Sequence, residues 1–75
     1  MATLSDLTPR EFEILQWVLA GRTNREIAAE IFVSEKTVEF HLNKLYTKLG
    51  VRTRNLASIW AIRQGLEMET EQISS

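Results

Sequence analysis

Hydrophobic residues recur along most of this chain at the spacing of an α-helix. Over residues 34–50, the aliphatic side chains of Val38, Leu42, Leu45 and Leu49 share one narrow stripe when the segment is wound at about 100° per residue. Apart from Phe40, the opposite side carries amides, hydroxyls and charged groups. An ordinary amphipathic surface helix shows the same division, so the stripe alone does not assign a role to this segment.

The segment before it predicts a second, shorter helix with a very short connection. Thr23 and Glu26 have the spacing of a capping box, and Ser34 is a natural N-cap for the longer helix. Two helices joined by so few residues cross steeply, which is the helix-turn-helix arrangement. The second helix would be anchored by its aliphatic stripe and present polar groups outward, which suits the DNA major groove.

Similar start and stop signals predict a helix on either side of this pair. Thr8 and Glu11 form another capping box, with Pro9 at the first helical position, and Thr53 is an N-cap. Glycines follow all but the second helix. We therefore predict an all-α, four-helix domain over residues 7–66, with helices at about 9–20, 24–32, 35–49 and 54–64. A flexible N-terminal tail at residues 1–6 and an acidic C-terminal tail at residues 67–75 flank it.

The last of these helices, residues 54–64, is apolar on most of its circumference. A small core can bury only one face of such a helix. A second buried face would then require a partner, and the alternative is that the helix is simply buried within the monomer. The apolar positions concerned are Leu56, Ala57, Ile59, Trp60, Ala61 and Ile62.

Composition narrows the class of protein. With 75 residues the chain forms one domain at most, and the absence of cysteine excludes a disulfide framework and a thiolate metal site. His41 is the only histidine, and a structural or phosphate-contact role outweighs catalysis. No glycine-rich phosphate loop and no convergent nucleophile and base are present, so we expect no enzyme, no cofactor and no small-molecule ligand in this domain. No apolar run is long enough for a membrane span, and we expect a cytoplasmic protein.

The charge distribution favours nucleic-acid binding more than the total does. The formal net charge is −1, which by itself argues against a polyanionic partner. Residues 34–54, however, carry five Lys/Arg against two Asp/Glu, whereas the segments on both sides are net negative. A local basic patch attracts phosphates although the whole molecule does not. A solvated charged face is the alternative explanation.

Several motifs in order resemble one known family. They are L-T-P-R-E at 7–11, N-R-E-I-A at 24–28, S-E-K-T-V-E-F-H at 34–41 and K-L-G-V-R-T-R at 48–54. This combination resembles the LuxR-type (GerE/FixJ/NarL-like) DNA-binding domain over residues 7–66. The resemblance implies a tetra-helical helix-turn-helix fold. It also implies a sequence-specific bacterial transcription regulator, or the output domain of one such as a response regulator, with helix 35–49 in the major groove.

The resemblance also assigns roles to residues. It implies that Glu39, Phe40 and Asn43 face base edges, although many members place Lys or Arg where this chain has Glu39. Asn pairs with adenine and Phe packs on a thymine methyl, whereas a carboxylate accepts from cytosine and repels phosphates. Arg54 either reaches the DNA backbone or pairs with a carboxylate such as Glu11 or Glu26. The expected backbone contacts are Thr23, Asn24, Lys36, Thr37, Lys44, Lys48 and Arg52.

In similar domains the fourth helix mediates homodimerisation. The matching surface here is centred on Asn55, Ile59, Ile62 and Arg63. The alternative function is a protein-interaction module that docks onto RNA polymerase or another regulator without strong DNA binding of its own. Because the chain begins with Met and shows no receiver or ligand-binding domain, we expect either a stand-alone regulator or an excised part of a larger one.

Overall fold

The computed structural model describes residues 2–66 of the chain. These residues form four α-helices and no strand, and a short 3-10 helix, η1 (Leu4–Asp6), precedes them. The predicted all-α class is therefore confirmed, and no helix end lies more than one residue from its predicted position. The acidic tail predicted at residues 67–75 lies outside the described residues. The helices are α1 (Pro9–Leu19), α2 (Asn24–Ile31), α3 (Glu35–Leu49) and α4 (Arg54–Arg63).

Side-chain caps determine where the helices begin. The Thr8 hydroxyl accepts a hydrogen bond from the Glu11 amide at 3.1 Å, and the Glu11 carboxylate accepts from the Thr8 amide at 2.9 Å. Thr23 and Glu26 form the same reciprocal pair at the start of α2. Each pair satisfies two amides that lack partners inside the helix, which is why the predicted starts are accurate. The hydroxyls of Ser34 and Thr53 cap α3 and α4.

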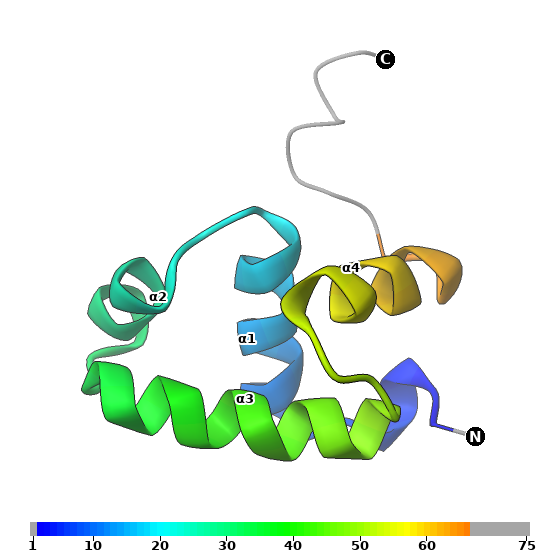
Figure 1. Ribbon diagram of the computed structural model, residues 1–75, viewed down its shortest axis with the longest axis horizontal. Coiled ribbons are helices and arrows are strands. Elements are labelled where there is room, and N and C mark those ends of the chain that lie inside the picture. The colour runs from blue at the N-terminus through cyan, green and yellow to red at the C-terminus, as the bar shows by residue number, and fades with distance from the viewer. Residues whose placement is uncertain (1, 67–75) are drawn as a thin grey trace, which may run out of the picture.

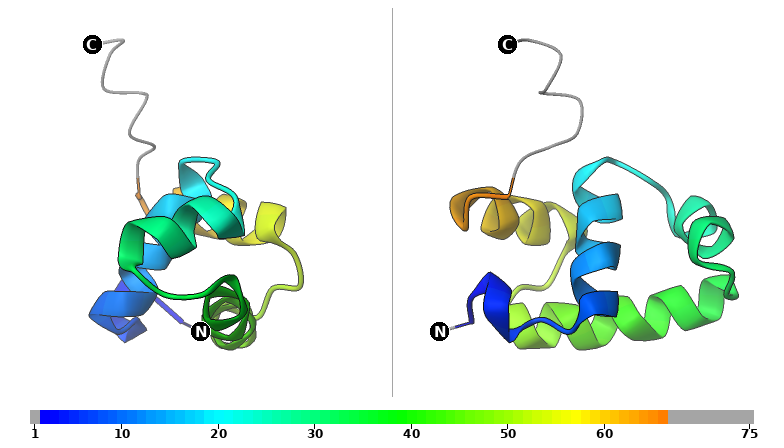
Figure 2. Two further views of the ribbon diagram at one scale, coloured as in Figure 1. Left: turned by 90° about the vertical axis from the view of Figure 1, so that its left-hand side faces the viewer. Right: turned by 180° about the vertical axis from the view of Figure 1, so that it is seen from behind.

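The helices surround one small aliphatic core. Figure 1 shows α1 standing between α2 and α4, with α3 along the lower edge of the molecule. The same edge position of α3 is visible from behind in Figure 2. The predicted stripe of α3 is buried, and no charged side chain of residues 2–66 is buried with it. The core residues are Ile14, Leu15, Val18, Leu19, Ile27, Ala28, Ile31, Val38, Leu42, Leu45, Leu49, Ala57 and Ala61.

The turn between α2 and α3 has a left-handed residue that is not glycine. Phe32 has φ 60° and ψ 46°, and its side chain is 92% exposed. The Val33 amide donates to the Ala28 carbonyl at 3.0 Å, which closes the end of α2. The left-handed conformation costs free energy for a residue with a Cβ, and an exposed ring recovers none of it by packing.

Helix α4 is only partly buried within the monomer. Ala57 and Ala61 face the core, whereas Leu56, Ile59 and Ile62 are 45%, 40% and 52% exposed. Burial of the whole helix in the monomer, one of the two alternatives drawn from the sequence, is therefore wrong. Its outer face remains an apolar surface.

The N-terminal segment differs from the flexible tail expected at residues 1–6. Residues 4–6 form η1, and Leu4 packs against the core. The Thr3 amide donates to the Asp6 carboxylate at 2.7 Å, and the Lys48 ammonium donates to the Asp6 carbonyl at 3.3 Å. The Thr3–Asp6 cap and the hydrogen bond from Lys48, 42 residues further along the chain, thus stabilise η1. Neither contact produces a hydrophobic periodicity in the sequence, which is why the segment was expected to be flexible.

Candidate nucleic-acid interface

The exposed side of α3 collects the side chains expected to face DNA bases. Glu39, Phe40 and Asn43 are all exposed on this helix, whose buried stripe holds it against the core. Phe40 is 59% exposed, an unusual position for a phenyl ring. Helix α3 lies along the edge of the molecule (Figure 1), where one of its sides is not covered by another helix.

Phe40 has a cation beside it. The Lys44 ammonium lies 5.3 Å from the centroid of the Phe40 ring, within the range of a cation–π interaction. The two side chains line a shallow apolar hollow together with Asn43, Thr47 and Lys48. The arrangement gives α3 an apolar contact surface directly beside a positive charge.

Lys48, one turn further along α3, has a different environment. Its ammonium lies 2.8 Å from a Glu11 carboxylate oxygen at the start of α1. The hydrogen bond from Lys48 is the main cause that holds the pKa of Glu11 below its ordinary value of 4.5. The expected phosphate contact is therefore occupied within the domain, by a carboxylate and by the Asp6 carbonyl.

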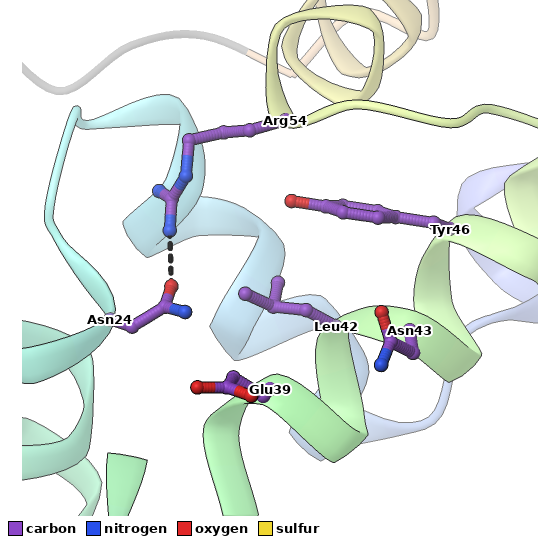
Figure 3. A pocket seen from close by; sticks show the side chains of 6 residues that line it. All are labelled: Asn24, Glu39, Leu42, Asn43, Tyr46 and Arg54. Carbon is purple, nitrogen blue, oxygen red and sulfur yellow. Dashed lines mark hydrogen bonds between the residues drawn. The ribbon is translucent and has the colours of Figure 1, made fainter. Parts of the chain in front are cut away.

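Arg54 joins the start of α4 to the start of α2. Its guanidinium donates to the Arg22 carbonyl at 2.6 Å and to the Asn24 side-chain oxygen at 2.5 Å. The pairing with Glu11 or Glu26 considered from the sequence is wrong, because Glu11 pairs with Lys48 and the described carboxylates form no ion pair with Arg54. Figure 3 shows the Arg54–Asn24 hydrogen bond at one side of a cleft.

This cleft lies between the start of α2, the middle of α3 and the start of α4. It has a volume of about 180 Å³ and is lined by Glu39 and Asn43, the two polar side chains expected to face bases. Burial raises the pKa of Tyr46 above its ordinary value of 10.0, so its phenol is neutral at physiological pH. The residues that line the cleft are Asn24, Glu39, Leu42, Asn43, Tyr46 and Arg54.

Comparison with known proteins places this geometry in a family. The family model described as GerE, "Bacterial regulatory proteins, luxR family", matches residues 5–61. The chain belongs to this family. Spore germination protein GerE of Bacillus subtilis is 42% identical over 59 residues, which cover 79% of this chain and 80% of GerE. The uncharacterized transcriptional regulatory protein YhcZ of the same organism is 43% identical over 63 residues, which cover 84% of this chain and 29% of YhcZ.

The structural comparison agrees with the sequence comparison. The response regulator ChrA of a heme-sensing two-component system superimposes with a TM-score of 0.76 at 48% identity, over 81% of this chain and 30% of ChrA. The chain thus spans about 30% of the length of several relatives that it matches, including YhcZ and the transcriptional regulatory protein LnrK of Bacillus subtilis. The predicted recognition, fold class and kind of function are confirmed. This is a LuxR-family helix-turn-helix domain. The members of this family are DNA-binding transcriptional regulators and not enzymes.

The remaining predicted backbone contacts of the LuxR-family domain lie at the ends of α2 and α3. The Thr23 hydroxyl is used in the cap of α2, and the Thr37 hydroxyl lies 3.0 Å from the Ser34 hydroxyl. Lys36 and Arg52 are exposed just inside the start and just beyond the end of α3. Residues 2–66 contain no group of acidic or histidine side chains able to hold a metal ion, and none of their helices is long and apolar enough to span a membrane.

Sequence reasoning did not identify Tyr46 as part of the site. The sequence assigned no role to Tyr46, which the structure shows to be half-buried next to buried Leu45. Its position three residues after Asn43 was the available signal, because side chains at this spacing lie on the same side of a helix.

Proposed function

We propose that this domain binds specific DNA sequences by placing α3 in the major groove. The observation that carries the proposal is the exposed row of Glu39, Phe40 and Asn43 on a helix held by four buried aliphatic side chains. With 15 residues, α3 is about 22 Å long, enough to lie across a groove about 12 Å wide. We propose that the regulator acts in the bacterial cytoplasm, alone or as the output domain of a longer protein.

Each proposed base contact has a distinct chemistry. The Asn43 amide offers one donor and one acceptor, which match adenine in the major groove. The Phe40 ring offers an apolar surface for a thymine methyl, and the Glu39 carboxylate accepts from the amino group of cytosine. Because Glu39 also repels nearby phosphates, it favours its own base at a cost in general affinity.

Phosphate contacts fix the register of α3 but carry no sequence information. The residues proposed for this role lie at the start of α2, along α3 and after its end. They are Thr23, Asn24, Lys36, Thr37, Lys44 and Arg52. Lys48, which the sequence also suggested for this role, is not proposed as a phosphate contact because Glu11 holds its ammonium.

We also propose that two copies associate through α4. Its outer face combines exposed Ile59 and Ile62 with the polar Asn55 and Arg63, so an apolar centre has a polar rim. A two-fold pair of domains would bind two half-sites of an operator. Ile62→Glu is expected to shift sedimentation toward the monomer, while Ser58→Ala, on the same helix, is not.

A titration of labelled duplexes, followed by fluorescence anisotropy, tests the base contacts. An operator is first selected from random sequences, and Asn43→Ala is then compared with wild type on the operator and on random duplex. We expect the variant to lose roughly 5- to 150-fold on the operator, since one bidentate pair contributes about 1–3 kcal/mol, and much less on random DNA. Equal weakening on both duplexes would show that Asn43 does not contact a base.

The exposed aliphatic row of α4 also favours a second candidate, docking onto RNA polymerase or another regulator. In that case the Ile62→Glu variant should remain a normal DNA binder and lose binding to purified polymerase. A change in sedimentation without any change in polymerase binding would favour the dimer.

A further inference from the structure

The cleft beside Glu39 and Asn43 contains one amide, that of Asn24, whose orientation is fixed by a neighbour. The guanidinium of Arg54 has hydrogen-bond donors and no acceptor. Since it contacts the Asn24 side chain at 2.5 Å, the oxygen of the Asn24 amide must face Arg54. The amide nitrogen then turns away from Arg54, and Figure 3 shows it directed into the cleft. Arg54 therefore determines which end of Asn24 is presented to a ligand.

A second donor enters the cleft from α3. The Tyr46 hydroxyl points across the cleft toward Arg54 and Asn24 (Figure 3). The hydroxyl keeps its proton at neutral pH, as tyrosine ordinarily does, and burial raises the pKa of Tyr46 further, so it is available as a donor. None of the hydrogen bonds among residues 2–66 uses it, although the ring beneath it packs against the core.

The third component is the charge of Arg54 itself. Two of its five N–H groups are used by the Arg22 carbonyl and the Asn24 oxygen, which leaves others in the same plane. An amide N–H, a phenol O–H and a cation thus line one cleft, and the Glu39 carboxylate lies below the Asn24 amide in the same view (Figure 3). Such a set suits the oxygen atoms of a phosphodiester. The Glu39 carboxylate in the same cleft repels the phosphate, so the three donor groups must outweigh it.

We propose that this cleft holds one phosphate of the DNA backbone, with Tyr46 and Asn24 as hydrogen-bond donors and Arg54 as the positioning residue for Asn24. The inference rests on the proposed function and deepens it. Glu39 and Asn43 line the same cleft, so a phosphate bound there fixes α3 at the depth and register from which those two side chains contact bases.

The first test removes one oxygen atom. Tyr46→Phe keeps the half-buried ring and removes only the hydroxyl, so the thermal midpoint should remain close to that of wild type. We expect affinity for operator and for random duplex to fall by a similar factor, about 10- to 150-fold, because the hydroxyl donates to a charged group. Ser58→Ala, which also removes one hydroxyl but lies on α4, is the matched control and should leave affinity unchanged.

A duplex with single methylphosphonate substitutions separates contact from structure. The uncharged group is placed at each backbone position of the operator in turn. At one position we expect wild type to weaken and the Tyr46→Phe variant to weaken little further, because the contact is already lost. Equal affinity of wild type and Tyr46→Phe for the unmodified operator would overturn the inference. A deficit in Tyr46→Phe that persists at every substituted position would also overturn it, since the hydroxyl would then act structurally.

The role of Arg54 is tested through Asn24. A single ammonium does not hold two acceptors in the planar geometry of a guanidinium, so Arg54→Lys should misorient the Asn24 amide. We expect Arg54→Lys to reduce DNA affinity severalfold in the wild-type background and to have little effect in an Asn24→Ala background. Equal effects in both backgrounds would show that Arg54 does not act through Asn24.

The outcomes also separate this inference from the function on which it rests. A wild-type domain that binds no duplex overturns both, whereas normal DNA binding together with an inert Tyr46→Phe overturns only the cleft. Free phosphate is another source of the same chemistry. If inorganic phosphate at constant ionic strength shifts the Tyr46 ring resonances without DNA, and Tyr46→Phe binds DNA normally, the cleft is a site for the free ion and the inference fails.

Discussion

Lys44 and Lys48 lie one turn apart on α3 and are predicted to behave differently on DNA. The Lys44 ammonium contacts the Phe40 ring, and no carboxylate of residues 2–66 pairs with it. The Lys48 ammonium is held at 2.8 Å by Glu11. From sequence alone both residues are equivalent phosphate contacts. The structure predicts that alanine substitution affects DNA binding at Lys44 and domain stability at Lys48.

The magnitudes follow from counterion release. Each phosphate neutralised contributes about −0.9 to the slope of log affinity against log salt. Lys44→Ala should therefore reduce the magnitude of that slope by about 0.9. If the variant and wild type bind equally at roughly 1 M salt, the variant then binds about eightfold more weakly than wild type at roughly 0.1 M salt. Lys48→Ala should leave the slope nearly unchanged. It should lower the free energy of unfolding by up to about 1 kcal/mol, because its ion pair is partly exposed.

Fluorescence anisotropy with random-sequence duplex at several salt concentrations measures both slopes, and thermal unfolding measures both stabilities. A loss of about 1 kcal/mol lowers the midpoint by about 4–8 °C for a domain of this size. If Lys48→Ala reduces the salt slope as much as Lys44→Ala does, the ion pair with Glu11 opens on DNA and the reasoning is wrong. If neither variant changes the slope, the basic patch is only a solvated face.

Three further predictions concern stability. The pKa of Glu11 is lower in the folded domain, so its stabilising contribution is present above pH about 4.5 and is lost as pH falls through the folded-state pKa. Glu11→Gln retains the cap acceptor, and we expect urea midpoints below pH 4.5 to vary less with pH; an unchanged profile would contradict the assignment. Phe32→Gly relieves a left-handed conformation without loss of packing and should stabilise the domain by about 0.5–1 kcal/mol in urea. A decrease would reveal a contact of the ring. Leu45→Ala removes a fully buried side chain and should cost about 2–5 kcal/mol, enough to abolish cooperative unfolding in a marginal domain.

The features predicted correctly from sequence are those that depend on neighbours three or four positions apart. The caps of α1 and α2 join Thr8 to Glu11 and Thr23 to Glu26, and the buried stripe of α3 repeats at the helical period. Such contacts form as soon as the backbone is helical, whatever the rest of the chain does. The same locality explains why η1 was not predicted, because a single turn of three residues shows no periodicity.

The partners of individual charges were decided by the tertiary structure. Lys48 and Glu11 are 37 residues apart, and Arg54 and Asn24 are 30 apart, so no helical pattern links them. Each pair forms because packing around one core brings the end of α3 to the start of α1, and the start of α4 to the start of α2. The sequence by itself determined which helices form, where they start and which side of α3 is exposed. Only the folded arrangement decided that Lys48 pairs with Glu11 while Lys44 does not, and that Tyr46 shares a cleft with Glu39 and Asn43, because those outcomes depend on distances between helices.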